Sequence, residues 1–138
     1  VSSDNRVLAT GYNSFPPGMH DSSLPNTRPL KYSKICHAEM NAVLHWNDKQ
    51  KESRLYCTGK CCRQCLYHIY SSGIRHIICA DNHGTFAETA EDREDIEILI
   101  NQTGLVVETV DTSKMKLFTL ISESYKKYKG EQMRLSGQ

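Results

Sequence analysis

Two short motifs contain the residue types that bind transition metals. The first is His37-Ala38-Glu39, and the second is Cys62-Arg63-Gln64-Cys65. Each motif is predicted to open a helix, and the start of a helix directs side chains and free backbone N–H groups toward one region. One imidazole and two thiolates would hold Zn²⁺ and leave a fourth position open. Catalytic zinc sites have this pattern, whereas structural sites close all four positions.

The chemistry of such a site is hydrolysis. A catalytic zinc ion lowers the pKa of water toward neutrality and so supplies hydroxide. Glu39 lies two residues after His37 and could shuttle protons without being a ligand. The alternative is a structural zinc site in which Cys61 or another residue closes the fourth position.

The chain has 6 cysteines, and three of them fall between positions 61 and 65. A secreted disulfide scaffold is usually shorter and richer in loops, so metal binding is the better interpretation. Cys36, Cys57 and Cys79 are interpreted as small buried hydrophobic residues rather than ligands. Among the histidines outside the motif, His20 alone is kept as a possible ligand of a second site, because it lies in a long loop.

Size and charge narrow the class of protein. The 138 residues match one domain, and 38% hydrophobic with 24% charged residues suits a globular fold. A net charge of +1 provides no general attraction to nucleic acid or membranes. The longest apolar run, residues 77–80, is too short to span a bilayer. We therefore expect a cytoplasmic protein with no membrane or nucleic-acid partner.

Helices and strands are predicted to alternate along the chain, after a possible hairpin turn at Asp4-Asn5 and with a long Pro- and Ser-rich loop over residues 13–34. In the first helix Met40, Val43 and Leu44 are predicted to form the buried stripe. Alternation of this kind predicts an α/β domain with helices on both faces of the sheet. The predicted strands are Arg6–Tyr12, Arg54–Thr58, His76–Ala80 and Leu105–Val110, and the predicted helices are His37–Trp46, Cys62–Ser72, Ala90–Gln102 and one starting at Ser113.

These motifs resemble the zinc-dependent cytidine and deoxycytidylate deaminase family, whose signature is His-x-Glu followed by Pro-Cys-x-x-Cys. The stretches that carry the resemblance are Gly11-Tyr12-Asn13, Cys36 to Ala42, and Cys62 to Cys65 followed by Ser72-Gly73-Ile74. Asn41 and the Gly-Tyr-Asn stretch favour the deoxycytidylate (dCMP) branch. The resemblance covers residues 6 to about 107.

The resemblance implies a three-layer α/β/α domain over residues 1–138, with a mixed sheet of about five strands. It implies Zn²⁺ on His37, Cys62 and Cys65, with Glu39 as the catalytic acid and base. The chain departs from the family at Cys61, where the signature has Pro. Only 5 residues precede Arg6, so we expect that the family's first helix and strand are missing. We expect the tail after residue 130 to be frayed.

The implied reaction is hydrolytic deamination of a deoxycytidine nucleotide, most simply dCMP to dUMP with release of ammonia. The implied nucleoside contacts are Asn13, Asn41 and the backbone around Ala38, although both asparagines could instead satisfy backbone groups. Relatives form oligomers, and some respond to dCTP and dTTP. We expect a homo-oligomer with these possible effectors.

The phosphate contacts are the least constrained part of the prediction. A monophosphate needs Arg, Lys or free N–H donors, but Asp81 to Gly84, after the strand at 76–80, offers neither Arg nor Lys. The substrate-binding candidates are therefore Arg28 and Lys31 in the long loop, assisted by His83, together with Lys60. The alternatives are a deaminase of dCTP or free deoxycytidine, a deaminase of tRNA or single-stranded DNA, and an inactive zinc-binding regulatory module.

Overall fold

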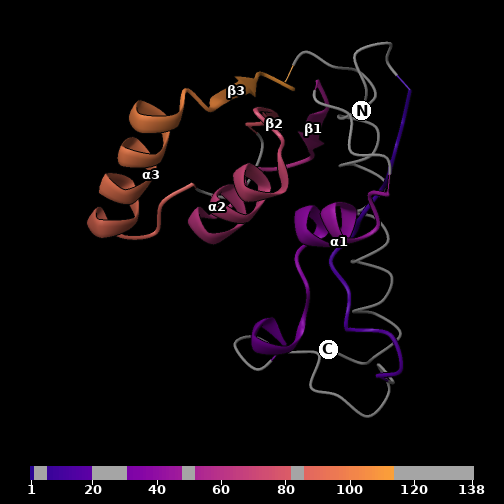
Figure 1. Cartoon of the computed structure of the whole chain (residues 1–138). Coiled ribbons are helices and arrows are strands. Elements are labelled where there is room, and N and C mark those ends of the chain that lie inside the picture. The colour runs from indigo at the N-terminus through magenta and orange to yellow at the C-terminus, as the bar shows by residue number, and fades with distance from the viewer. Residues whose placement is uncertain (2–5, 20–30, 48–51, 82–85, 114–138) are drawn as a thin grey trace.

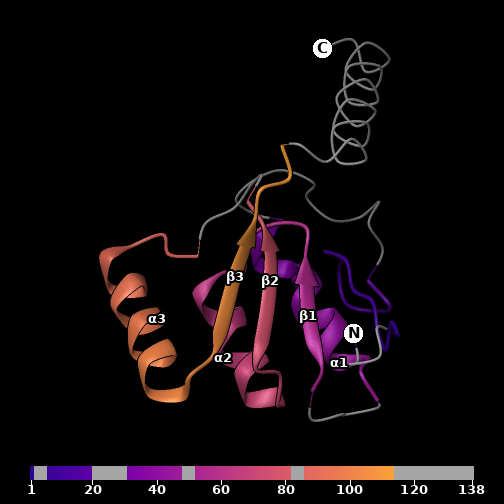
Figure 2. The same ribbon diagram turned by 90° about the horizontal axis from the view of Figure 1, so that it is seen from above.

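The computed structural model describes residues 1, 6–19, 31–47, 52–81 and 86–113. Within these residues a parallel three-stranded sheet has the order β1-β2-β3. Helices join successive strands, as parallel pairing requires (Figures 1 and 2). The elements in chain order are η2 (Tyr32–Lys34), α1 (Ala38–Leu44), β1 (Arg54–Cys57), α2 (Arg63–Ser72), β2 (His76–Ala80), α3 (Ala90–Thr103) and β3 (Val106–Val110).

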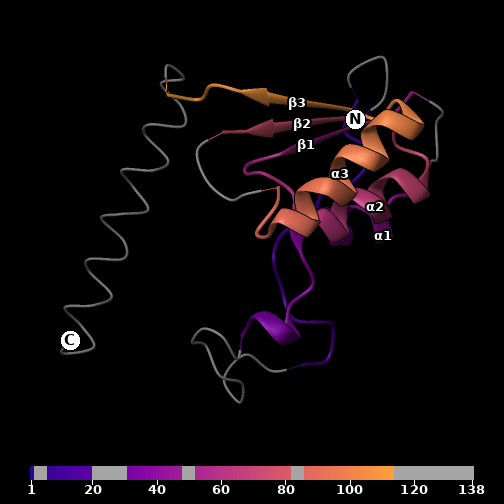
Figure 3. The ribbon, with the colours of Figure 1, turned by 90° about the vertical axis from the view of Figure 1, so that its left-hand side faces the viewer.

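The three α-helices lie on the same side of the sheet (Figure 3). The row Leu55, Ile77 and Val107 runs across the paired strands on the covered face. Leu66 and Ile69 of α2 are fully buried against this face. The opposite face carries alternating residues of the same strands, including the exposed Tyr56 and Glu108. Apolar burial on one face therefore fixes the register of the strands.

The helix ends follow the sequence closely. The side chain of Thr89 caps α3 by accepting a hydrogen bond from the Asp92 N–H, and Asp92 accepts one from the Thr89 N–H in return. Gly73 and Gly104 end α2 and α3 at φ of 109° and 70°. Both angles lie in the left-handed region that favours glycine. No helix in the described part of the chain is long and apolar enough to cross a membrane.

Several sequence predictions about the fold need correction. Residues 6–12 are irregular rather than a strand, and Ser14 forms only an isolated antiparallel bridge with Cys36. Leu44 is 68% exposed because α1 ends at this residue, so it does not belong to the buried stripe.

Among the described residues the sheet has three parallel strands, not about five mixed ones, and the described α-helices cover one of its faces. The Asp4-Asn5 turn and nearly all of the helix from Ser113 lie outside the described residues.

Candidate metal centre and cleft

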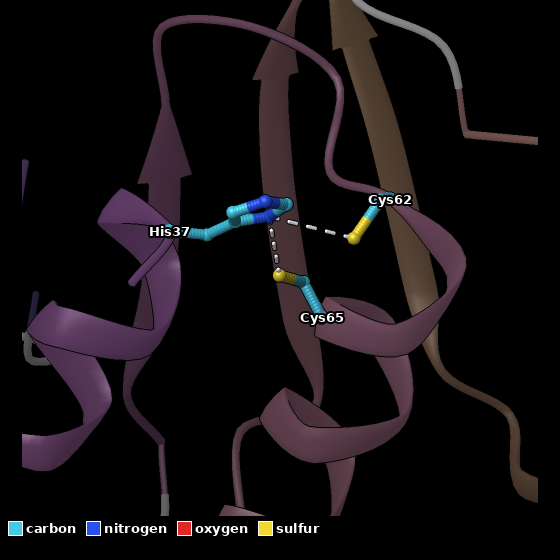
Figure 4. A group of neighbouring side chains, drawn as sticks. All are labelled: His37, Cys62 and Cys65. Carbon is cyan, nitrogen blue, oxygen red and sulfur yellow. Dashed lines mark hydrogen bonds between the residues drawn. The ribbon is translucent and has the colours of Figure 1, made fainter. Parts of the chain in front are cut away.

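Two helix starts bring the predicted zinc ligands together. His37 is the residue before α1, and Cys62 is the residue before α2, with Cys65 in the first turn of α2. The His37 Nδ1 atom lies 3.6 Å from the Sγ of Cys62 and 3.4 Å from the Sγ of Cys65 (Figure 4). The ligand atoms of all three residues lie within 4.8 Å of one another. The tertiary structure therefore gathers residues that are up to 28 positions apart.

The donor set fits Zn²⁺. One imidazole nitrogen and two sulfurs are ligands that zinc prefers. Among the described residues, no fourth His, Cys or carboxylate joins this group. Cys61 points instead into the core, where it is 0% exposed. The structure thus brings Cys62, not Cys61, to His37, and the three ligands leave a coordination position open.

The two thiols interact strongly with each other. A hydrogen bond from Cys65 lowers the pKa of Cys62 to about 5, with a further contribution from His37. The pKa of Cys65 is raised by its hydrogen bond to Cys62, by burial and by the negative charge of Glu39. One proton of the pair is therefore released more easily than that of an isolated thiol, and the second less easily.

Glu39 lies in the first turn of α1 and lines an open cleft of about 1000 Å³. His37 and Cys62 line the same cleft, whereas the buried Cys65 does not. A cleft of this volume is large enough for a nucleotide. Glu39 is thus placed on the cleft wall beside the metal ligands without being one of them.

The loop at residues 11–14 holds the start of α1. Because the side chain of His37 is directed to the cysteines, it makes no cap hydrogen bond to its own helix. The Oδ1 atom of Asn13 instead accepts from the Ala38 N–H at 2.8 Å. Asn41 donates back to the Tyr12 carbonyl at 2.7 Å and contacts the Ser14 hydroxyl at 3.0 Å. These bonds clamp the loop to the helix that carries Glu39.

Gly11 lets the loop approach this closely. A Cβ atom at Gly11 would lie 2.1 Å from the Ala38 carbonyl oxygen and 2.4 Å from the Ala42 nitrogen. Both obstructing atoms belong to the backbone of α1 and cannot rotate away. The first and last residues of the Gly-Tyr-Asn stretch therefore each have a structural role. Gly11 allows the close approach to α1, and Asn13 caps the start of that helix.

The candidate phosphate ligands are dispersed. Lys60 lines the cleft, between β1 and Cys62. Lys31 lies in the described part of the chain, but it does not line the cleft. Arg28, His83 and the possible second-site ligand His20 lie outside the described residues. Of the predicted basic contacts, only Lys60 is placed at the cleft among the described residues.

Sequence reasoning missed two features of this region. The contact of Gly11 with α1 joins residues about 30 positions apart, and no local pattern indicates it. The cluster of Cys57, Cys61 and Cys79 was also missed, because each cysteine was interpreted on its own. The proximity of Cys57 and Cys79 could have been predicted, because they occupy paired positions of two neighbouring parallel strands.

Comparison with known proteins agrees with this arrangement. Residues 1–81 match the family model of the cytidine and deoxycytidylate deaminase zinc-binding region. The human deoxycytidylate deaminase is 34% identical over 85 residues, which cover 56% of this chain and 48% of the human protein. The mouse deoxycytidylate deaminase is 32% identical over 101 residues, covering 67% of this chain and 57% of that protein. The chain thus spans about half the length of the curated relatives that it matches.

A solved structure is similar over a larger share of the chain. The crystal structure of a dCMP deaminase from the cyanophage S-TIM5, in complex with dCMP and dUMP, aligns with a TM-score of 0.55 and 26% identity. The alignment covers 76% of this chain and 74% of the phage chain. The likeness supports the same α/β fold.

Proposed function

The chain belongs to the cytidine and deoxycytidylate deaminase zinc-binding family, and on that premise we propose that it deaminates a deoxycytidine nucleotide by hydrolysis. The preferred substrate is dCMP, and the products are dUMP and ammonia. The observation that carries the proposal is the cluster of His37, Cys62 and Cys65, of which His37 and Cys62 line the same cleft as Glu39. The phage neighbour, whose structure contains dCMP and dUMP, supports the choice of nucleotide.

His37, Cys62 and Cys65 would hold the metal. A Zn²⁺ ion there lowers the pKa of water toward neutrality and so supplies a hydroxide nucleophile. Glu39 accepts one proton from the attacking water and delivers it to N3 of the cytosine, and it then accepts the proton of the hydroxyl on C4 and delivers it to the leaving amine. Water adds at C4, the bond between C4 and the amino nitrogen breaks, and a carbonyl remains at C4.

The loop at residues 11–14 positions this machinery. The Ala38 N–H already donates to Asn13, so we assign Asn13 to holding the start of α1 beside the ligands. Asn41 secures the same loop through Tyr12 and Ser14. We retain Asn41 as a candidate contact of the sugar. We also retain the Ala38 backbone as a candidate contact of the pyrimidine O2, which requires its N–H to leave Asn13 when substrate binds.

We assign the phosphate to Lys60 among the described residues. A phosphate group requires a cation or N–H donors, and Lys60 brings an ammonium to the cleft. The effectors dCTP and dTTP and a homo-oligomer rest on the resemblance, a cytoplasmic location rests on the sequence composition, and all of these stay predictions.

The test is ammonia release from dCMP, deoxycytidine, dCTP and a cytosine-containing oligonucleotide, each with zinc-loaded protein. We expect the highest kcat/KM for dCMP. Lys60→Ala should reduce the preference for dCMP over deoxycytidine, whereas Lys31→Ala serves as a matched control and should leave it unchanged. Ammonia release from the oligonucleotide alone would overturn the assignment to a free nucleotide. Absence of release from every substrate would favour a non-catalytic zinc module.

A further inference from the structure

Three cysteines that do not belong to the His37 group form a second cluster. The Sγ atom of Cys61 lies 3.3 Å from that of Cys57 and 3.6 Å from that of Cys79. All three sulfurs lie within 4.8 Å of one another. Cys57 ends β1, Cys79 is its partner in β2, and Cys61 belongs to the connection between β1 and α2. The pairing of two parallel strands thus creates two corners of the cluster, and the following loop adds the third.

The spacing of the sulfurs matches that of metal ligands in the same chain. The corresponding distances from His37 to Cys62 and Cys65 are 3.6 and 3.4 Å. With a metal–sulfur bond of about 2.3 Å, sulfurs around one ion are separated by roughly 3.7–4.0 Å. An ion could therefore enter the cluster after an outward movement of the thiols of only a few tenths of an ångström.

Two cysteines of the cluster are buried, and the third reaches the cleft. Cys61 and Cys79 are both 0% exposed, and all three cysteines are free thiols. Cys57 is half-buried and lines the cleft, so it provides a route for a small ion. Hydrogen bonds from Cys57 and Cys61, together with the positive charge of Lys60, lower the pKa of Cys79, whereas hydrogen bonds within the cluster and burial raise the pKa of Cys57 and Cys61.

The donor set selects a soft ion. Thiolate ligands favour Cu⁺, Zn²⁺ and iron–sulfur clusters over hard cations. Among the described residues, no His or carboxylate completes a four-ligand zinc site here. Three sulfurs without a fourth donor suit a three-coordinate Cu⁺ ion better than tetrahedral Zn²⁺.

We propose that Cys57, Cys61 and Cys79 form a second metal centre, distinct from the His37 site, which binds one Cu⁺ ion through three thiolates. The two centres are linked through the chain, because Cys61 and the zinc ligand Cys62 are consecutive residues whose side chains belong to different clusters. Copper at the second centre therefore ties β1 and β2 to the segment that leads into α2.

The experiment uses the zinc-loaded, fully reduced chain under nitrogen. Cu⁺ is added as its acetonitrile complex, excess copper is removed, and bound copper and zinc are measured by elemental analysis. We expect about one equivalent of copper with the zinc retained, and X-ray absorption that shows copper bound by sulfur alone. Cys61→Ala and Cys79→Ser should each reduce copper affinity by at least about tenfold, with zinc content unchanged.

Cys36→Ser is the matched control, because Cys36 is a half-buried free cysteine outside both clusters. This variant should bind copper like the native chain. If Cys61→Ala does not fold, Cys79→Ser and Cys57→Ser carry the test. Copper uptake that is unaffected by Cys79→Ser would overturn the proposal, as would displacement of zinc by copper. A disulfide between two of the three cysteines in the reduced preparation, seen as the loss of two hydrogens, would also overturn it.

Discussion

Gly11→Ala tests whether the loop at residues 11–14 positions the metal centre. The added Cβ would lie 2.1 Å from the Ala38 carbonyl oxygen, whereas ordinary van der Waals contact begins near 3.4 Å. The loop must therefore retreat by roughly 1 Å, since the obstructing atoms are helix backbone. Such overpacking costs about 1–3 kcal/mol. The retreat also strains the hydrogen bonds of Asn13 and Asn41, at about 1 kcal/mol each.

We expect Gly11→Ala to lose about 3 kcal/mol of unfolding free energy, which corresponds to a Tm lower by roughly 10 °C. Because the loop holds Ala38, the residue after His37, we expect the Kd for zinc, measured in competition with a chelator, to rise about tenfold. Thermal unfolding and chelator competition measure the two effects. Gly104→Ala is the control: its φ of 70° imposes backbone strain, but nothing lies within 4 Å of the new Cβ.

The control should lose about 1 kcal/mol and keep native zinc affinity. The reasoning is refuted if Gly11→Ala unfolds at the native temperature and holds zinc as the native chain does. A loss of stability equal to that of Gly104→Ala, with native zinc affinity, would show that the loop does not support the ligands.

Three further changes test the site itself. Glu39→Gln should keep its zinc and lose activity by at least about a hundredfold, because the amide cannot shuttle protons, and near-native turnover would refute the acid–base role. Cys62→Ala should lose zinc by elemental analysis while Cys61→Ala retains it, and the reverse result would mean that Cys61 is the ligand. Asn41→Ala should lower Tm and also reduce kcat/KM by one to two decades, about 1–3 kcal/mol, because its amide secures the loop beside the cleft. Native kinetics with a lower Tm would leave Asn41 a purely structural role.

The sequence was sufficient for the elements around the metal. The apolar run at His76–Ala80 and the glycines after α2 and α3 marked boundaries that the structure reproduces within one residue. These signals are local, because capping and strand burial depend on a few neighbouring residues. The cluster of His37, Cys62 and Cys65 was also predictable from the sequence, because imidazole and thiolate are ligands that zinc prefers.

The failures concern contacts between distant segments. Residues 6–12 have strand-like composition, but a strand exists only where a partner pairs with it, and among the described residues only the Ser14–Cys36 bridge forms. Leu44 fits a helical stripe, yet the helix ends there and leaves the side chain in solvent. The apolar periodicity of a sequence does not show where its helix ends, whereas the burial of a side chain depends on which residues pack against that turn of the helix.

Cys61 departs from the family signature in the sequence and joins a cysteine cluster in the structure. In the sequence it is a departure from the family's Pro, which would fix φ ahead of the helix. In the structure the helix start is intact without proline, with Cys62 in extended geometry at φ of −72°. The position therefore does not need the ring to direct Cys62 toward His37. The thiol is left to face Cys57 and Cys79, so the residue that stands where the family signature has Pro is the one that completes the second cluster.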